Sequence, residues 1–340
     1  MESAGDLEST VRVAVIGAGS WGTTVAHLAA RNSSVTLWAR SAELVSEIRN
    51  NHTNERYLPG YPLNPALRAT TDLAEALDGI DLVIMGVPSH GFRSVFGAAA
   101  PHIAATVPVI SLTKGVESVT HARMTEVVRE ILPMNPFGVL SGPNLAKEVM
   151  AGHPAATVVA TAELHHAELV QRAIGSELFR VYSNTDVVGA EISGSLKNIL
   201  ALGAGMVDGM GFGDNTKATF ITRGLNEMAR LGTALGGRIL TFGGLAGLGD
   251  LIATCSSPQS RNRNVGVQLG KGRAIDEITA EMNMVAEGVK SCAPVYELAL
   301  AHGLDLPIVE QVKRVVCDGV PASEALAALL SRPATTEFEF

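Results

Sequence analysis

Short apolar runs and amphipathic stretches alternate along the first half of the chain. Six runs are nearly continuous in Val, Ile, Leu and Ala, as expected of strands buried on both faces of a parallel sheet: Val11–Ile16, Val35–Trp38, Leu82–Val87, Val107–Leu112, Phe137–Leu140 and Ala156–Ala160. Helix-length segments lie between several of them, at Thr23–Ala30, Ser41–Arg49, Leu73–Leu77 and Ala122–Ile131. Strands that alternate with helices predict βαβ units and therefore an α/β fold with a doubly wound sheet.

The strand pattern fades after about Val187. The segments that follow have helical spacing, and Gly or Pro separates most of them: Glu191–Met206, Lys217–Leu235, Asp276–Met284, Ala293–His302, Leu306–Val316 and Ala322–Leu330. We therefore expect a Rossmann-type α/β domain over residues 1–188, an all-helical C-terminal domain over residues 189–332 and a mobile tail over residues 333–340.

Composition narrows the class of protein. The 340 residues suffice for two domains, and 46% of them are hydrophobic, which is ample material for buried cores. A net charge of −8 argues against a nucleic-acid-binding protein. Three widely separated cysteines favour a reducing compartment. Because prolines interrupt the longest uncharged stretch, Ser94–Thr113, we expect no membrane insertion and a cytoplasmic protein.

Residues 17–22 read Gly-Ala-Gly-Ser-Trp-Gly, between the first predicted strand and the first predicted helix. In this context the first glycine permits a tight turn, the second lets the backbone approach a pyrophosphate, and the third allows close helix–strand packing. Gly17, Gly19 and Gly22 are therefore predicted to bind a dinucleotide. A purely structural glycine turn is the alternative.

The end of the second predicted strand bears on the choice of cofactor. It reads Trp38-Ala39-Arg40-Ser41 and lacks the acidic residue that accepts hydrogen bonds from the adenosine ribose of NAD. An arginine suits a 2′-phosphate, so Arg40 predicts NADPH as the preferred cofactor and NADH as the alternative. The competing interpretation is that Arg40 only stacks on adenine or faces solvent.

Polar residues follow two later strands, where ligands of open α/β sheets bind. Lys114 comes after one of them and is expected to contact the cofactor or an anionic substrate, unless it is an exposed loop lysine. The segment Ser141–Asn144 follows the next strand and offers backbone N–H groups and an amide.

The predicted helical half contains two further patches. Lys197 lies one helical turn after Ser193 and Gly194, small residues that leave room around an ammonium near a ligand; a surface lysine is the alternative. In the second patch, Asp250 is suited to orienting a lysine, and Ser260–Arg263 to gripping a phosphate, unless that segment is a solvated loop. No signature of a metal site or of a catalytic nucleophile accompanies them.

Taken together, these pieces resemble the bacterial-type NAD(P)-dependent glycerol-3-phosphate dehydrogenases over roughly Val11–Leu330. The resemblance rests on the ordered combination of GAGSWGT (17–23), SLTKG (111–115), SGPNLAKE (141–148), SGSLKNILALGAG (193–205), NTKATFITRGLNEM (215–228), GLGDL (247–251), QSRNR (259–263) and VAEG (285–288). It implies hydride transfer between NAD(P)H and dihydroxyacetone phosphate to give sn-glycerol 3-phosphate for phospholipid synthesis, with Lys197 as proton donor and acceptor.

The resemblance also implies the binding residues. The cofactor would contact Ser20, Trp21, Arg40, Tyr57, Lys114, Ala146, Arg261, Val285 and Glu287. The substrate would contact Lys114, Gly142, Asn144, Lys197, Asp250, Ser260, Arg261 and Asn262. Two positions depart from the family pattern, since Asn144 stands where Ser or Thr is common and Ser41 where a second basic or polar residue often follows.

Two alternative functions stay open at this point. A two-domain reductase for a 3-hydroxy acid would share the plan but need a carboxylate site in place of QSRNR (259–263). A non-catalytic dinucleotide sensor would make Lys197 and Asp250 incidental. A homodimer is a further expectation.

Overall fold

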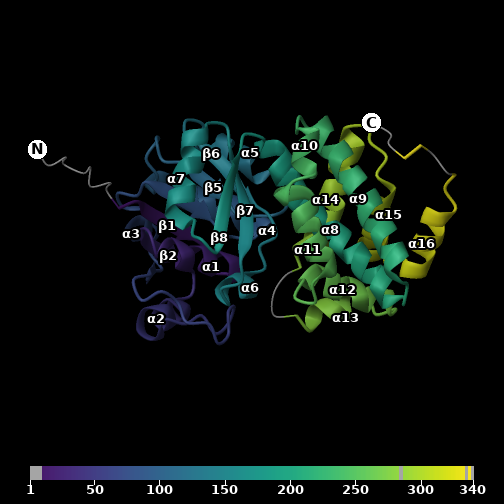
Figure 1. Ribbon diagram of the computed structural model, residues 1–340, viewed down its shortest axis with the longest axis horizontal. Coiled ribbons are helices and arrows are strands. Elements are labelled where there is room, and N and C mark those ends of the chain that lie inside the picture. The colour runs from purple at the N-terminus through teal and green to yellow at the C-terminus, as the bar shows by residue number, and fades with distance from the viewer. Residues whose placement is uncertain (1–9, 283–285, 334–335, 338–340) are drawn as a thin grey trace, which may run out of the picture.

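The described strands form one mixed sheet. The structure, a computed structural model, describes residues 10–282, 286–333 and 336–337. The sheet has the strand order β3-β2-β1-β4-β5-β6-β7-β8 and lies beside a bundle of helices (Figure 1). Its strands are β1 (Arg12–Ile16), β2 (Ser34–Trp38), β3 (Arg68–Thr70), β4 (Leu82–Met85), β5 (Val109–Ser111), β6 (Phe137–Ser141), β7 (Ala155–Thr161) and β8 (Phe179–Asn184).

All six predicted strands are confirmed, and the two that the apolar pattern did not reveal are the edges of the sheet. β3 is only three residues long, and β8 exposes Arg180, Tyr182 and Ser183. An edge strand has one sheet neighbour and is commonly short or polar. A search for continuous apolar runs therefore finds the interior strands and passes over the edges.

The direction of the strands corrects the expectation of a parallel sheet. Strands β1 to β6 are parallel, but β7 pairs antiparallel with β6, and β8 runs parallel to β7. The link between β6 and β7 contains only the five-residue helix α6 (Ala146–Met150). This short link does not cross to the opposite end of the sheet. The chain therefore enters β7 at the end where it left β6, and β7 runs antiparallel to β6. The order β3-β2-β1-β4-β5-β6 reverses direction between β1 and β4, and in such folds dinucleotides bind outside the carboxyl ends of the strands at that point.

Alternating side chains of β1 point to opposite faces of the sheet, and each face has its own apolar cluster. Val13 and Val15 pack with side chains of α1, α2 and α7, whereas Ala14 and Ile16 pack with those of α3, α4 and α5. The helices of this half are α1 (Ser20–Ala29), α2 (Ala42–Asn51), α3 (Leu73–Leu77), α4 (Ser89–Ala99), α5 (Met124–Ile131), α6 and α7 (Leu164–Ile174).

The second half of the chain is built around one buried helix, α8 (Val187–Gly209). Every residue of α8 from Gly189 to Val207 is buried. Between residue 185 and the end of the described chain, the other elements are also helical: α9 (Asp214–Ala234), α10 (Ile239–Phe242), the π-helical turn η2 (Leu245–Gly249), α11 (Asp250–Ser256), α12 (Arg261–Gly270), α13 (Ile275–Ala280), α14 (Glu287–Ala301), α15 (Pro307–Asp318) and α16 (Ala322–Leu330).

Helices α8 and α12 make backbone contact through paired glycines. A Cβ on Gly205 of α8 would lie 2.1 Å from the carbonyl oxygen of Arg263, and one on Gly266 of α12 would lie 2.0 Å from that of Leu202. Gly209 and Gly270 repeat the arrangement one turn later, at 2.3 and 2.4 Å from backbone oxygens of the opposite helix. Only glycine permits this approach, which brings the start of α12 directly beside α8.

Three features at the margins of the fold complete the description. By length and composition alone, the stretch Ile239–Ser256 is apolar enough to cross a membrane, but it comprises α10, η2 and α11, and 44% of it is buried.

The division of the chain at residues 188 and 189 stays a prediction; α8 begins just before it, at Val187. Most of the expected mobile tail, residues 333–340, lies outside the described residues.

Candidate active site

The glycine-rich turn after β1 has the geometry of a dinucleotide-binding loop. Gly17 has a φ of 116°, and a Cβ there would lie 2.6 Å from the carbonyl oxygen of Gly86. A Cβ on Gly22 would lie 2.0 Å from the oxygen of Gly17. At Gly19, by contrast, a Cβ would meet nothing within 4 Å. Packing within the chain therefore requires the first and third glycines, while the second leaves open space at the start of α1, which fits the approach of a pyrophosphate.

The residues expected around the adenosine lie near this turn in different environments. Arg40 is exposed and precedes Ser41, whose hydroxyl caps α2 by accepting a hydrogen bond from the backbone N–H of Leu44. The ring of Trp21 packs on Phe179 with 6.1 Å between centroids. Tyr57 is half-buried. The cofactor contacts of Arg40, Trp21 and Tyr57 stay predictions.

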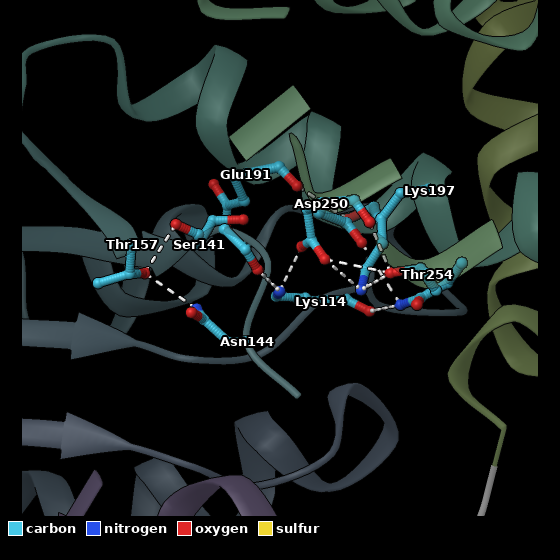
Figure 2. Close-up of polar contacts among 12 residues, drawn as sticks. Lys114, Ser141, Asn144, Thr157, Glu191, Lys197, Asp250 and Thr254 are labelled. Carbon is cyan, nitrogen blue, oxygen red and sulfur yellow. Dashed lines mark hydrogen bonds and ion pairs between the residues drawn. The ribbon is translucent and has the colours of Figure 1, made fainter. Parts of the chain in front are cut away.

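Two lysines from distant parts of the chain meet on one buried carboxylate (Figure 2). Lys114, in the loop after β5, places its Nζ 2.5 Å from Asp250 Oδ2. Lys197, on α8, places its Nζ 2.9 Å from Asp250 Oδ1 and 2.8 Å from Thr254 Oγ1. Lys114 also donates to the backbone oxygen of Gly142 at 3.1 Å. The side chain of Lys114 is 14% exposed, that of Lys197 10% and that of Asp250 2%. Neither lysine is therefore a surface residue.

Gly194 explains how the two lysines approach each other. A Cβ on Gly194 would lie 3.2 Å from Lys114 Cγ and 3.2 Å from Ser141 Oγ. The small residue ahead of Lys197 was expected to make room for Lys197, but the side chain that it admits is that of Lys114. The helical half thus accepts a lysine from the sheet half of the chain.

Burial and charge set the electrostatics of this cluster. Burial lowers the pKa of Lys114 to about 8; the neighbouring ammonium of Lys197 adds to this effect, and Asp250 opposes it. Burial by itself would raise the pKa of Asp250, but the two lysines outweigh it and hold that pKa below its ordinary value. The cluster therefore contains an ionised carboxylate and an ammonium that titrates close to neutral pH.

The loop after β6 adds polar groups to the same site. Asn144 Nδ2 donates to Thr157 Oγ1 at 2.9 Å, and that hydroxyl donates to the backbone oxygen of Ser141 at 2.9 Å. Asn144 Oδ1 and Ser141 Oγ are buried, and neither has a hydrogen-bond partner among the described residues. Such atoms are rare in folded proteins and suit contact with a ligand or water.

The first turn of α12 brings a further cation close to α8. Ser260 caps the helix by accepting a hydrogen bond from the backbone N–H of Arg263, and Arg261 is the first helical residue. Arg261 is exposed to solvent, although surrounding protein atoms desolvate its guanidinium enough to lower its pKa, and Glu287 opposes that shift. An accessible guanidinium at the start of a ten-residue helix favours an anionic ligand.

Asn262 connects three helices. Its Nδ2 donates to Asn198 Oδ1 of α8 at 2.9 Å, and its Oδ1 accepts from the backbone N–H of Gly288 of α14 at 3.0 Å. Asn198 in turn donates to the backbone oxygen of Lys114 at 3.3 Å. This amide chain ties α12 and α14 to the loop that carries Lys114.

Comparisons with known proteins decide the family. A family model described as NAD-dependent glycerol-3-phosphate dehydrogenase N-terminus matches residues 12–167, and the model of the C-terminus of the same enzymes matches residues 186–327. The chain belongs to this family. The family membership and the doubly wound sheet with a helical C-terminal half are therefore both confirmed for this dehydrogenase.

Individual relatives cover nearly the whole dehydrogenase chain. Glycerol-3-phosphate dehydrogenase (NAD(P)+) 2 of Sphingopyxis alaskensis is 54% identical over 320 residues, which are 94% of this chain and 96% of that protein. The enzyme of Mycobacterium avium is 49% identical over 321 residues, 94% of each chain. The crystal structure of glycerol-3-phosphate dehydrogenase from Coxiella burnetii superposes with a TM-score of 0.91 at 38% identity, covering 95% of this chain and 99% of that one.

The remaining predicted residues of the dehydrogenase lie as follows. Glu287, at the start of α14, accepts a hydrogen bond from Ser89 Oγ at 2.9 Å, and burial raises its pKa. Ala146 is the first residue of α6. Val285 lies outside the described residues.

Sequence reasoning missed Thr254 and Asn198, which contact the lysine cluster directly. Thr254 carries a findable signal, because it follows Asp250 by four residues and so shares its helix face. Asn198 follows Lys197 directly in the sequence, but its bond to the Lys114 loop depends on tertiary contact, which the sequence pattern does not reveal.

A separate cavity of about 510 Å³ lies on the surface near the end of β8. Tyr182, Arg238, Leu240 and Leu245 are among the residues that line it. None of the predicted site residues that the structure describes contributes to this lining. The lysine cluster, not this cavity, is the candidate active site of the dehydrogenase.

Proposed function

We propose that this chain catalyses the NADPH-linked reduction of dihydroxyacetone phosphate to sn-glycerol 3-phosphate, and its reverse, with Lys197 as the group that donates and accepts the proton. One observation carries the proposal. The two lysines on Asp250 lie in a buried cluster at the ends of β5 and β6, at the same edge of the sheet as the glycine-rich turn. Membership in the dehydrogenase family supports the same reaction.

The chemistry requires a hydride at the carbonyl carbon and a proton at the carbonyl oxygen. Bound NADPH supplies the hydride. An ammonium has three N–H donors, and Lys197 directs two of them to Asp250 and Thr254. The third is available for the carbonyl oxygen. Asp250 and Thr254 thus orient the proton donor, and Asp250 stabilises its positive charge.

Lys114 is assigned to binding. It directs two of its donors to Asp250 and the Gly142 oxygen, which leaves one for the substrate. Gly142 and Asn144 flank this position, and the buried Oδ1 of Asn144 suits a substrate hydroxyl. The phosphate is assigned to Arg261, with Ser260 and Asn262 beside it at the start of α12.

The cofactor is assigned to the turn of Gly17, Gly19 and Gly22 and the first turn of α1, with NADPH preferred over NADH. Support for the preference comes from Arg40, an exposed arginine where a carboxylate would repel a 2′-phosphate. The other proposed cofactor residues are Ser20, Trp21, Tyr57, Lys114, Ala146, Arg261, Val285 and Glu287.

Steady-state kinetics test this function. We expect the wild-type protein to oxidise NADPH only when dihydroxyacetone phosphate is present. A dinucleotide sensor would bind NADPH without turnover, and a 3-hydroxy-acid reductase would turn over only with an unphosphorylated keto acid. Either result would exclude the proposal.

The role of Lys197 has its own test. Lys197→Met should lower kcat by about 10²- to 10⁴-fold, because general acid–base assistance is lost, while NADPH binding measured by fluorescence titration is retained. Lys290→Met is the matched control, since Lys290 is an exposed lysine on α14. A folded Lys197→Met protein with more than about a tenth of wild-type kcat would contradict the assignment.

We also propose that the protein is cytoplasmic and forms a homodimer. Support for the first comes from its cysteines, all of them free thiols, which suit a reducing compartment. Light scattering coupled to size-exclusion chromatography tests the second, and a monomeric mass at micromolar concentration would exclude it.

A further inference from the structure

Glu191 is a buried carboxylate that the proposed reaction does not use. It lies near the start of α8 and is 1% exposed. Its Oε1 accepts a hydrogen bond from the backbone N–H of Thr125 at 2.9 Å. Its Oε2 accepts from Thr125 Oγ1 at 2.6 Å and from Arg123 Nη1 at 3.0 Å. Arg123 and Thr125 lie at the start of α5, so each of these bonds joins α8 to the sheet half of the chain.

These partners close a loop that starts at Lys114. Val116 and Arg123 form an isolated antiparallel bridge, and within it the backbone N–H of Glu117 donates to the oxygen of Ala122 at 2.9 Å. The residues from 114 to 125 therefore form a compact loop with Lys114 at one end and Thr125 at the other. Glu191 binds the far end of this loop.

The near end of the loop contacts the same face of α8. Glu191, Gly194 and Asn198 follow one another at intervals of three and four residues, which places them on one side of the helix. Gly194 admits the Lys114 side chain, and Asn198 donates to the Lys114 backbone oxygen. Lys197 stands next to Asn198 and reaches Asp250 (Figure 2).

We propose that Glu191 is a positioning residue that clamps the 114–125 loop to α8 and so keeps the Lys114 ammonium beside Lys197 on Asp250. Two ammonium groups on one carboxylate repel each other, so Lys114, the member of the pair that a loop carries, needs a second attachment. Glu191 provides it at the other end of that loop. A buried ion pair is by itself weak evidence for stability, and the placement of these bonds across the seam between α5 and α8 favours a geometric role.

The test substitutes an amide of equal size. This inference rests on the proposed function, so the assay is NADPH oxidation with dihydroxyacetone phosphate. Glu191→Gln should lower kcat by about 10- to 100-fold, since small misplacements of reacting groups have effects of this order. The dissociation constant for NADPH should stay within about twofold, because the glycine-rich turn is not touched. The pH–kcat profile should also change, because hydration of the Lys114 loop would relieve the burial that lowers the pKa of Lys114 to about 8 and would raise that pKa.

Glu227→Gln is the matched control. Glu227 is also a buried carboxylate that accepts two backbone N–H groups at the start of a helix, those of Ile308 and Val309 on α15. Its substitution likewise replaces a buried carboxyl group of the helical half by an amide, and kcat and the pH profile should be unchanged. Thr125→Ser, which keeps the hydroxyl, should behave as wild type, whereas Thr125→Val removes one donor and should show part of the Glu191→Gln loss.

Amide hydrogen exchange separates this inference from the proposed function. Residues 114–125 should exchange faster in Glu191→Gln than in wild type or Glu227→Gln, whether or not the substrate is the proposed one. Lack of wild-type turnover together with faster exchange would refute the function and leave the clamp standing. Unchanged kcat, pH profile and exchange in Glu191→Gln would overturn the clamp. If Glu191→Gln does not fold, kcat, the pH profile and amide exchange are measured in Thr125→Val instead. Wild-type values for all three in that variant would refute the proposal.

Discussion

Substituting Gly266 by Ala tests the backbone contact between α8 and α12. A Cβ at this position would lie 2.0 Å from the Leu202 oxygen, whereas real Cβ atoms keep at least 3.0 Å, so the helices must separate by about 1 Å. Alanine gains about 1 kcal/mol in helix propensity over glycine, but overpacking costs about 1–3 kcal/mol and sometimes more. The separation also loosens the three other glycine contacts. We expect a net loss of about 2 kcal/mol, or about 4–8 °C in the thermal midpoint.

Gly97→Ala is the control for this substitution. Gly97 lies in α4, is exposed, and a Cβ there would meet nothing within 4 Å. The propensity gain is then unopposed, so its thermal midpoint should stay level or rise. Differential scanning fluorimetry compares the two variants with wild type, and kinetics should show a raised KM for dihydroxyacetone phosphate only in Gly266→Ala, because α12 begins with Arg261. A Gly266→Ala protein as stable as Gly97→Ala, with wild-type KM, would refute the reasoning.

Three further outcomes are expected. Arg261→Ala should raise KM for dihydroxyacetone phosphate about 30- to 140-fold, which corresponds to a loss of roughly 2–3 kcal/mol of binding free energy. An unchanged KM in steady-state assays would show that another residue binds the phosphate. Arg40→Asp should lower kcat/KM for NADPH relative to kcat/KM for NADH. The assignment of Arg40 would be rejected if wild type preferred NADH and the variant showed the same preference. Burial raises the pKa of Glu227 to about 7, so its contribution to stability is present below pH 4.5 and is lost as pH rises to about 7. The thermal midpoint of Glu227→Gln relative to that of wild type should therefore rise between pH 4.5 and pH 7.5. A difference between the two midpoints that stays constant over this pH range would contradict the reasoning.

The interior of the sheet was predictable because burial on both faces leaves a mark in the sequence. The runs at β1, β4 and β5 are nearly continuous in apolar residues, and the glycine-rich turn stands where the fold requires it. The edges β3 and β8 carry no such mark, since one side of each strand is not paired. Helix α12 was also missed: its sequence, RNRNVGVQLG, is polar and contains two glycines. Contact with α8, and not its own propensity, accounts for that helix.

The site was predictable as a set of residue types but not as an arrangement. Lys197 and Asp250 were selected from small neighbours and charge, yet 53 residues separate them, and 136 separate Lys114 from Asp250. Local spacing does not indicate that both lysines share one carboxylate. Glu191 carried no local signal at all, because its partners lie 66 and 68 residues earlier. Such pairings are set by the packing of α8 on the sheet.

The lysine cluster makes the reaction depend on assembly of the whole chain. Asp250 and Lys197 belong to the helical half and Lys114 to the sheet half, whereas the glycine-rich turn lies entirely within the sheet. A fragment that ends before α8 would retain the dinucleotide loop and lack Lys197, the proposed proton donor. Partial unfolding that releases the helices from the sheet would likewise abolish turnover, while cofactor binding would be weakened by the loss of Glu287 and retained in part by the glycine-rich turn. Catalytic activity therefore reports the docking of the two halves, whereas the part of cofactor binding that the glycine-rich turn supplies reports the integrity of the sheet.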